Sequence, residues 1–323
     1  MTKSTIIQIR NKNGGSCNLS AYGARILGIR VPLTAGEREL VVSLVNKRER
    51  ERNPYFGAIV GRVAGRIRGG KAVISGETYY FEQNEGAQTV HGGRKNLSNR
   101  MWNIKHVDDT SVTFTITSPH GENGFPGNLC IEVKYRLSEE NHLRIEYQAS
   151  TDRTTNFNPT NHVFFNLDGD MKSSIKHHYL QIDADEYLPL DQQNLPLLKR
   201  SVEGSNFDFR KPKKIGEGMV EDDPQIKINN GLNHPFLLNQ NSPQVLLTSR
   251  DKKVSVAMTT TQSAVIIYTT GDSLANVETT MGKMGVAGAI ALEAQMPPGL
   301  PPSEILIEPN ETYQASTSYQ FYF

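Results

Sequence analysis

Two residues suited to proton transfer, a histidine and a glutamate, stand beside apolar runs. His162 precedes the run Val163-Phe164-Phe165, so a strand that starts at His162 would hold the imidazole at its mouth. Glu293 interrupts a second apolar run, which starts at Ala289 and is followed by the stretch MPPGLPP. A carboxylate in such a strand costs free energy unless it is paired or hydrogen-bonded. Glu293 therefore either faces solvent on an edge strand or projects into a site. His162 either belongs to that site or is a half-buried histidine that bonds a neighbouring carbonyl.

Further polar residues lie among glycines in the N-terminal third. Arg62 and Arg66 stand four residues apart in the segment GRVAGRI, which is part of a glycine-rich stretch. That glycine content disfavours a stable helix and predicts a strand or loop whose backbone comes close to another group. The segment has neither a GxGxxG pattern nor the lysine-serine ending of a phosphate loop. His91 is followed directly by two glycines. Surface salt bridges would explain the two arginines equally well.

The elements that position these residues are predicted to be antiparallel strands. Apolar and polar residues alternate over 112–116, 129–137 and 143–149, which is typical of strands with one buried face. The pattern returns over 254–258 and 264–268. No amphipathic helix of three turns and no linker-like break is evident, and the sign-alternating run KRERER at 47–52 is predicted to be a solvated loop. The sequence therefore predicts an all-β protein, a large antiparallel β-sandwich, with residues 1–323 in a single domain.

Composition argues against several classes of partner. The formal net charge is +1 and no basic face with interleaved aromatic residues appears, so no nucleic-acid partner is expected. The longest apolar run is too short to span a bilayer. The two cysteines, Cys17 and Cys130, lack a metal-like spacing, and no basic-then-apolar leader is evident, which predicts a cytoplasmic protein. His177-His178 would lie on opposite faces of a strand, so no metal site is expected.

Six segments together resemble the aldose 1-epimerase, or galactose mutarotase, family. In chain order they are YFGAIVGRVAGRI, EGAQTVHGG, GENGFPGNL, NPTNHVFFNLDG, NFDFRKPKKIG and LEAQMPPGLPPSEILIEPNETY. The resemblance extends over nearly the whole chain. It implies the galactose mutarotase-like supersandwich, in agreement with the strand pattern. It also implies an enzyme that interconverts the α and β anomers of a free aldose such as glucose or galactose without a cofactor. A monomer or homodimer is expected.

The resemblance also assigns roles to individual residues. It places His162 at the family's general acid and Glu293 at its general base, and it matches His91 and Arg66 to polar residues that line the sugar pocket. The family usually has an aspartate before the histidine of a DHxF-like segment, whereas this chain has Asn233 there, in GLNHPF. An asparagine offers one acceptor oxygen and two donors. Asn233 is therefore expected to change sugar binding or sugar preference and to leave the acid and the base in place.

The expected chemistry is opening and reclosing of a cyclic hemiacetal by one acid and one base. A glutamate with a reference pKa of about 4.3 would be ionised at neutral pH, and its charge would favour the protonated form of a nearby histidine, whose reference pKa is about 6.5. Each group would contribute roughly 10²- to 10⁴-fold to the rate.

Two alternatives stay open at this point. The first is a related enzyme that acts on a phosphorylated sugar or a disaccharide. A phosphate would need at least two arginines near the pocket, and the candidates are Arg62, Arg66, Arg68 and Arg94. The second is a non-catalytic sugar-binding or regulatory protein on the same scaffold, because a fold does not fix a function. Asn233 is the feature that best supports this second alternative.

Overall fold

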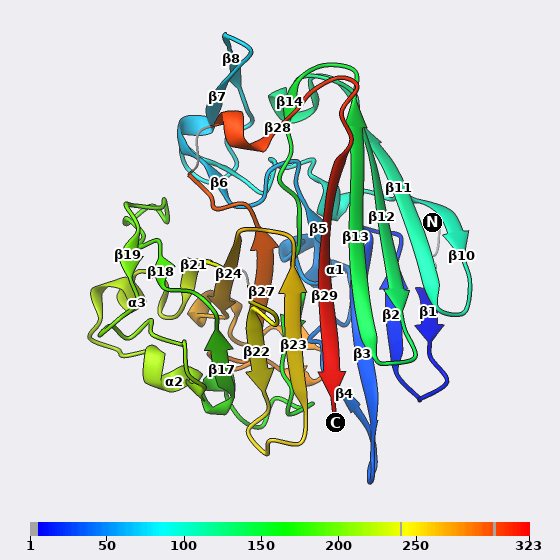
Figure 1. The fold of residues 1–323 in the computed structure, drawn as a ribbon, viewed down its shortest axis with the longest axis vertical. Coiled ribbons are helices and arrows are strands. Elements are labelled where there is room, and N and C mark those ends of the chain that lie inside the picture. The colour runs from blue at the N-terminus through cyan, green and yellow to red at the C-terminus, as the bar shows by residue number, and fades with distance from the viewer. Residues whose placement is uncertain (1–5, 240, 300–301) are drawn as a thin grey trace.

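The computed structural model describes residues 6–239, 241–299 and 302–323, and its largest sheet has nine antiparallel strands (Figure 1). The C-terminal strand β29 lies in the middle of this sheet, between β13 and β23. In spatial order the strands are β10 (Asn103–Val107), β11 (Ser111–Ser118), β12 (Leu129–Leu137), β13 (His142–Thr151), β29 (Tyr313–Tyr322), β23 (Ser255–Thr260), β22 (Val245–Thr248), β17 (Tyr179–Ile182) and β20 (Lys213–Lys214).

A six-stranded and a four-stranded sheet accompany it. The six-stranded sheet has the order β16 (Phe164–Phe165), β27 (Ile290–Gln295), β24 (Ala264–Thr269), β21 (Asn233–Leu237), β18 (Glu186–Tyr187) and β19 (Arg200–Ser201). The four-stranded sheet contains β1 (Ile6–Arg10), β2 (Ser16–Ser20), β3 (Arg25–Leu33) and β4 (Gly36–Glu39), and β1 contacts both β11 and β12.

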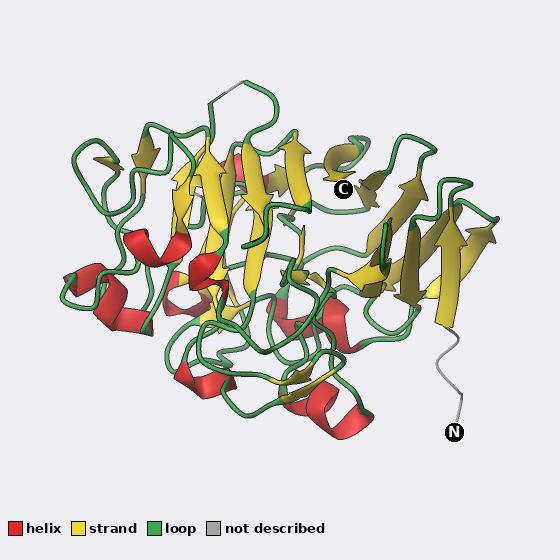
Figure 2. Cartoon of the chain, turned by 90° about the horizontal axis from the view of Figure 1, so that it is seen from below, coloured by secondary structure: helices red, strands yellow, loops and turns green. Residues whose placement is uncertain are grey.

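Short strand pairs and short helices complete the described part of the chain. The pairs are β15 (Thr160–Asn161) with β5 (Ile59–Val60), β6 (Arg66–Ile67) with β9 (Thr89–Val90), β7 (Lys71–Ile74) with β8 (Glu77–Tyr80), β14 (Thr155–Asn156) with β28 (Leu306–Ile307), and β25 (Glu278–Thr279) with β26 (Gly282–Lys283). The α-helices are α1 (Lys47–Arg52), α2 (Ile215–Gly218) and α3 (Pro224–Asn229). Figure 2 shows the helices mostly among the loops along one side of the strands. None of these described helices is long and apolar enough to cross a membrane.

The two larger sheets pack face to face through their apolar residues. The rings of Phe165 on β16 and Tyr319 on β29 lie 5.4 Å apart, and the Tyr319 hydroxyl donates to the carbonyl of Leu292 on β27 over 3.3 Å. One buried cluster includes residues from β1 through to β29. This cluster supports the interpretation of residues 1–323 as one domain, which stays a prediction.

The predicted large antiparallel β-sandwich is confirmed, with one local correction. The run KRERER at 47–52 forms helix α1, not a loop, because the Asn46 side chain accepts from the Glu49 amide at 3.0 Å and Arg50 and Arg52 stand in the last turn, where the helix dipole favours cations. The strands predicted at 254–258 and 264–268 are neighbours in sequence, but β23 belongs to the nine-stranded sheet and β24 to the six-stranded one.

Candidate active site

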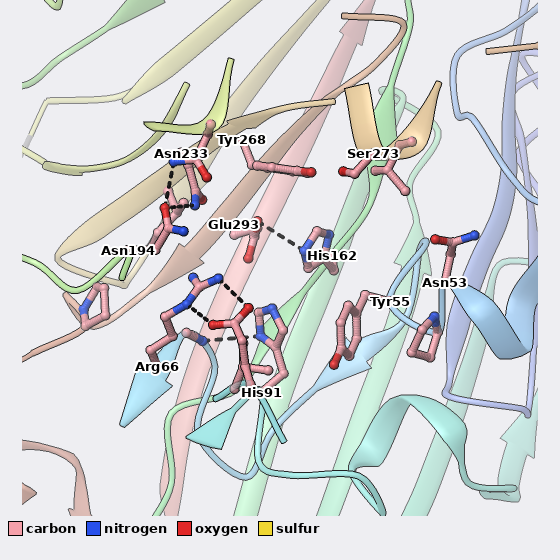
Figure 3. A pocket seen from close by; sticks show the side chains of 18 of the residues that line it. Asn53, Tyr55, Arg66, His91, His162, Asn194, Asn233, Tyr268, Ser273 and Glu293 are labelled. Atoms are coloured by element: carbon pink, nitrogen blue, oxygen red, sulfur yellow. Dashed lines mark hydrogen bonds and ion pairs between the residues drawn. The ribbon is translucent and has the colours of Figure 1, made fainter. Parts of the chain in front are cut away.

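The five residues singled out from the sequence line one pocket of about 510 Å³ (Figure 3). They come from five separate parts of the chain and surround the same space. They are Arg66, His91, His162, Asn233 and Glu293. The structure thus brings all five together, whereas their roles stay predictions.

His162 lies in the short gap between two strands that have different partners. Strand β15 pairs with β5, and β16 pairs with β27. The strand that was predicted to start at His162 therefore starts at Phe164 instead. The His162 amide donates to the Ala58 carbonyl and the His162 carbonyl accepts from the Gly57 amide, each at 2.8 Å. Gly57 has φ +69°, and a Cβ there would lie 2.0 Å from the Ile26 carbonyl oxygen. These contacts hold the backbone on both sides of the imidazole in place.

Glu293 stands in a central strand, because β27 lies between β16 and β24. Along β27, Ile290, Leu292 and Ala294 belong to the apolar core, while Glu293 and Gln295 point the other way and line the pocket. The alternative of an edge-strand glutamate in solvent is therefore wrong, since Glu293 is only 4% exposed. Its carboxylate projects into the pocket.

His162 and Glu293 face each other directly, with 3.3 Å between His162 Nε2 and Glu293 Oε1. Burial lowers the pKa of His162 to about 4. Burial raises the pKa of Glu293 to about 8, although the positive charge of Arg66 partly opposes this shift. The expectation from reference pKa values, an ionised glutamate that promotes protonation of the histidine, is therefore wrong for the free enzyme. Loss of hydration for both charges outweighs their mutual attraction, and the shared proton resides on Glu293.

His91 is held as a hydrogen-bond donor to the pocket. Its backbone amide donates to the Gly65 carbonyl at 3.0 Å, and its Nδ1 accepts from the Gly65 amide at 3.3 Å. Burial and the neighbouring His162 and Arg66 keep the pKa of His91 well below its usual value, so the ring is neutral and carries its hydrogen on Nε2. The ring of Tyr55 packs 4.6 Å from the His91 ring.

The tautomer of His91 with its hydrogen on Nε2 also disfavours metal binding by this ring. In the described part of the chain, the ligand atoms of His91, His162 and Glu293 all lie within 4.8 Å of one another, close enough to hold an ion. However, the Gly65 amide engages the one lone pair that a neutral His91 could offer to a metal. The arrangement favours hydrogen-bond donation by His91 over ligation.

Arg66 enters the pocket as half of an ion pair. Strand β6 pairs with β9, which places Arg66 opposite Val90, next to His91. The guanidinium contacts both oxygens of Glu85, with 2.8 Å between Nη2 and Oε1. Such a two-point contact fixes the plane of the guanidinium.

The other arginines proposed for a phosphate site lie elsewhere. Arg62 is buried and donates to carbonyl oxygens of other segments, including that of Pro126 at 2.6 Å. Arg68 pairs with Asp191 and Arg94 with Glu82. Only Arg66 of the four candidates lines the pocket. The cluster of two or more of these arginines that a phosphate would require is not formed.

Asn233 begins β21 and belongs to a group of three amides. Its Nδ2 donates to Asn194 Oδ1 at 3.3 Å, and Asn229 Nδ2 donates to the same oxygen at 2.6 Å. Asn194 and Asn229 carried no signal in the sequence, because asparagine is ordinary in a turn and at the end of a helix. Asn194 lies far from Asn233 in the chain, whereas Asn229 ends α3 just before β21. Tyr268 was also missed, although it stands two residues from Ile266 on β24 and so shares the face that lines the pocket. His234 does not line the pocket; it is buried beside Phe207 and contacts Gln225.

Comparisons with known proteins agree with this geometry. A family profile described as Aldose 1-epimerase matches residues 5–320. The aldose 1-epimerase of Escherichia coli (strain K12) is 35% identical over 98% of this chain and 94% of its own length. The galactose mutarotase of Bos taurus is 33% identical over 94% of this chain and 90% of its own length.

Solved structures give the same result. The galactose 1-epimerase of Lactobacillus acidophilus NCFM superposes with a TM-score of 0.87 at 33% identity, covering 98% of this chain and 93% of that one. A GalM/aldose epimerase homologue from C. elegans has a TM-score of 0.90 at 26% identity, and 99% of each chain is covered. The chain therefore belongs to the aldose 1-epimerase family of carbohydrate isomerases.

Proposed function

We propose that this protein is a mutarotase that interconverts the α and β anomers of a free aldose such as glucose or galactose. The observation that supports this proposal is the buried contact of 3.3 Å between His162 Nε2 and Glu293 Oε1 inside a pocket. Ring opening needs one proton removed from the C1 hydroxyl and one delivered to the ring oxygen. These two oxygens are bonded to the same carbon, so an acid and a base side by side match them.

In the proposed mechanism Glu293 is the base and His162 the acid. The ionised carboxylate takes the C1 hydroxyl proton while the imidazolium protonates the ring oxygen, and the bond between C1 and the ring oxygen breaks. The resulting aldehyde turns about the C1–C2 bond and the ring recloses from the other face with both proton transfers reversed. His91, as a neutral N–H donor, and Arg66, held by Glu85, are suited to hold substrate oxygens.

The burial of Glu293 helps this base to act. A carboxylate with a raised pKa takes a proton more readily once it is ionised, and a base works best when its pKa is near the working pH. The sugar provides the means of ionising it. The C1 hydroxyl donates to the carboxylate and the ring oxygen accepts from the imidazolium, so binding stabilises the form in which the proton has moved from Glu293 to His162.

The test is polarimetry on freshly dissolved α-D-glucose and α-D-galactose. Glu293→Gln and His162→Asn should each lower the enzymatic rate at least about a hundredfold, since a positioned acid or base supplies about 10²- to 10⁴-fold. His142→Asn and Glu203→Gln change the same residue types at exposed positions and should leave the rate unchanged. Circular dichroism checks that the variants are folded. Wild-type rates in either pocket variant would contradict the assignment, and sugar binding without rate enhancement in the native protein would favour a binding protein.

A further inference from the structure

Three aromatic rings lie around the imidazole of His162. The ring centroid of Phe164 is 4.9 Å from that of His162, and the two ring planes meet at 34°. The ring centroid of Tyr55 is 6.0 Å away, with 21° between the planes. Tyr268 lies at 6.2 Å and nearly perpendicular, and Figure 3 shows both tyrosines beside the imidazole. Phe164 and Tyr55 thus turn their faces roughly parallel to the imidazole, inside the pocket that all these residues line.

The imidazole of His162 has few polar partners. Its Nε2 faces Glu293 Oε1 at 3.3 Å. Its Nδ1 is buried and has no hydrogen-bond partner on any other residue that the structure describes. In many acid–base sites the second ring nitrogen of the histidine donates to a carboxylate or a carbonyl, which orients the ring and stabilises its charged form. Since His162 lacks such a partner, the neighbouring rings are what hold it.

The ring of Tyr55 is held in place through its backbone. The buried guanidinium of Arg25 donates to the Pro54 carbonyl at 3.2 Å and to the Phe56 carbonyl at 3.3 Å. These two carbonyls flank Tyr55 in the chain. The backbone is therefore fixed on both sides of the tyrosine, and its ring is kept beside His162.

The ring of Phe164 is held by its strand and by another aromatic ring. Strand β16 pairs with β27, where Phe164 stands opposite Ala291. The Phe164 carbonyl accepts from the Val42 amide at 2.8 Å. The Phe164 side chain is buried and stacks on Phe56, with 4.2 Å between the ring centroids. These contacts keep the Phe164 ring against His162.

The arrangement favours a positive charge on the imidazole. A ring face attracts a cation that lies within about 6 Å of the ring centroid, and more strongly where water is excluded. The distances from His162 to Phe164 and to Tyr55 meet this condition. Aliphatic side chains in the same places would also exclude water, but they would offer no such attraction. The two rings therefore stabilise the imidazolium relative to an aliphatic lining.

We propose that Tyr55 and Phe164 are positioning residues for the general acid, and that their ring faces hold the imidazole of His162 and stabilise its protonated form. This inference rests on the proposed mutarotase function. In the proposed mechanism His162 can donate only after the proton has moved to it from Glu293. A contact that favours the imidazolium raises the fraction of bound enzyme that is ready to react. The two rings therefore act on the chemical step.

The experiment measures kcat and KM by stopped-flow polarimetry with α-D-glucose and α-D-galactose. Tyr55→Leu and Phe164→Leu each remove one ring and keep the position apolar. Each should lower kcat about three- to tenfold, the range expected for loss of one cation–π contact, and change KM less than twofold. Tyr55→Phe keeps the ring and removes only the hydroxyl, so it should retain the native kcat. Because Tyr55 also packs on His91 whereas Phe164 has no ring contact with His91 in the described structure, a loss in both leucine variants assigns the effect to His162.

The matched control is Phe81→Leu. Phe81 is buried and stacks on Phe125 with 4.2 Å between the ring centroids, and neither residue lines the pocket. This variant loses an aromatic pair of the same kind and should keep kcat within about twofold of the native value. Circular dichroism checks that all variants are folded.

The possible outcomes separate this inference from the proposed function. Native kcat values in both leucine variants would overturn the inference and leave the mutarotase function standing. An equal loss in Tyr55→Phe and Tyr55→Leu would assign the effect to the hydroxyl and overturn the role of the ring. A raised KM with unchanged kcat would make the rings a platform for the sugar, which also overturns the inference. Absence of mutarotation in the native protein would instead contradict the proposed function.

Discussion

The proposed mechanism predicts that the pH dependence of mutarotation is set by the one proton that His162 and Glu293 share between about pH 4 and pH 8. Below this window both groups are protonated, so the base is lost. Above it both are deprotonated, so the acid is lost. Because kcat/KM reports the ionisation of free enzyme, it should be flat within the window and fall about tenfold per pH unit on either side. The two limbs belong to the pair as a unit and not to one residue each.

The size of the effect follows from the two pKa values. In the proposed mechanism the reactive form carries the proton on His162, whereas the pKa values place it on Glu293 in the free enzyme. The pKa values of about 8 and about 4 differ by four units, so moving the proton costs about 5 kcal/mol at 1.36 kcal/mol per unit. Two charge-assisted hydrogen bonds to the sugar, at about 1.5–3 kcal/mol each, offset most of this cost. Substrate binding thus supplies the ionised base, without any need for high pH.

Stopped-flow polarimetry with α-D-glucose from about pH 3.5 to pH 9.5, corrected for the blank reaction, measures the profile. A kcat/KM that rises through pH 8 to a plateau would refute the shared proton, because Glu293 alone would then limit the rate. His162→Asn provides the internal control. With the histidine gone, only the base remains, so the weak residual activity should rise with pH where the native activity falls.

Three further predictions follow from the same contacts. Glu293→Gln should stabilise the fold by up to about 3 kcal/mol at pH 7. The folded glutamate keeps its proton to about pH 8 whereas the unfolded one ionises near pH 4.5, so the native glutamate lowers stability between these pH values. Urea titrations should show the gain in the variant at pH 7 and its loss at pH 4.5. Gly92→Ala should destabilise the protein by about 2–4 kcal/mol in thermal melts, because Gly92 has φ +85° and the new Cβ would lie 2.2 Å from the Gly61 carbonyl oxygen. The control Gly76→Ala has a similar φ of +83° but open space around the Cβ, so it should cost only about 1 kcal/mol. Glu85→Gln should move the alkaline limb of the pH profile below pH 8, because the charge of Arg66 would act on Glu293 without its counter-ion; an unmoved limb would contradict that coupling.

The strands and the core were predictable because they follow a local pattern. Strand β12 buries every second residue from Leu129 to Leu137, as the alternation predicted. In the register of β12 against β13, residues that the two alternating segments both place on the buried face stand opposite each other, such as Val133 and Tyr147. What the pattern could not provide is the assignment of strands to sheets, since that depends on pairings between distant segments. Strands β23 and β24 illustrate this limit.

The site was predictable where one residue breaks a local rule. Glu293 is a carboxylate in an apolar strand, and the structure places it on the pocket face of a central strand. Asn194 and Asn229 break no rule, because asparagine is ordinary in a turn and at a helix end. Only the fold brings Asn194 to Asn233, whereas Asn229 already lies close to it in the chain. The pKa values of His162 and Glu293 could not be predicted from the sequence, because they depend on how deeply the two side chains are buried. That burial reverses the order of ionisation that the reference values predict.

Burial of the pair has a further consequence for the reaction cycle. A glutamate and a histidine in water would exist at pH 7 mainly as carboxylate and neutral imidazole, with a base present and no acid. The pocket instead retains one proton on the pair. The net charge of the Glu293–His162 pair is zero whether that proton is on Glu293 or on His162. In the proposed mechanism each ring opening moves a proton from the sugar to Glu293 and another from His162 to the sugar. Reclosure reverses both transfers, so His162 regains a proton from the sugar and Glu293 returns one to it without exchange with solvent. Burial of the two ionisable groups thus lowers the stability of the fold, which Glu293→Gln should reveal as a gain in stability. The same burial keeps one acid and one base on the pair at neutral pH.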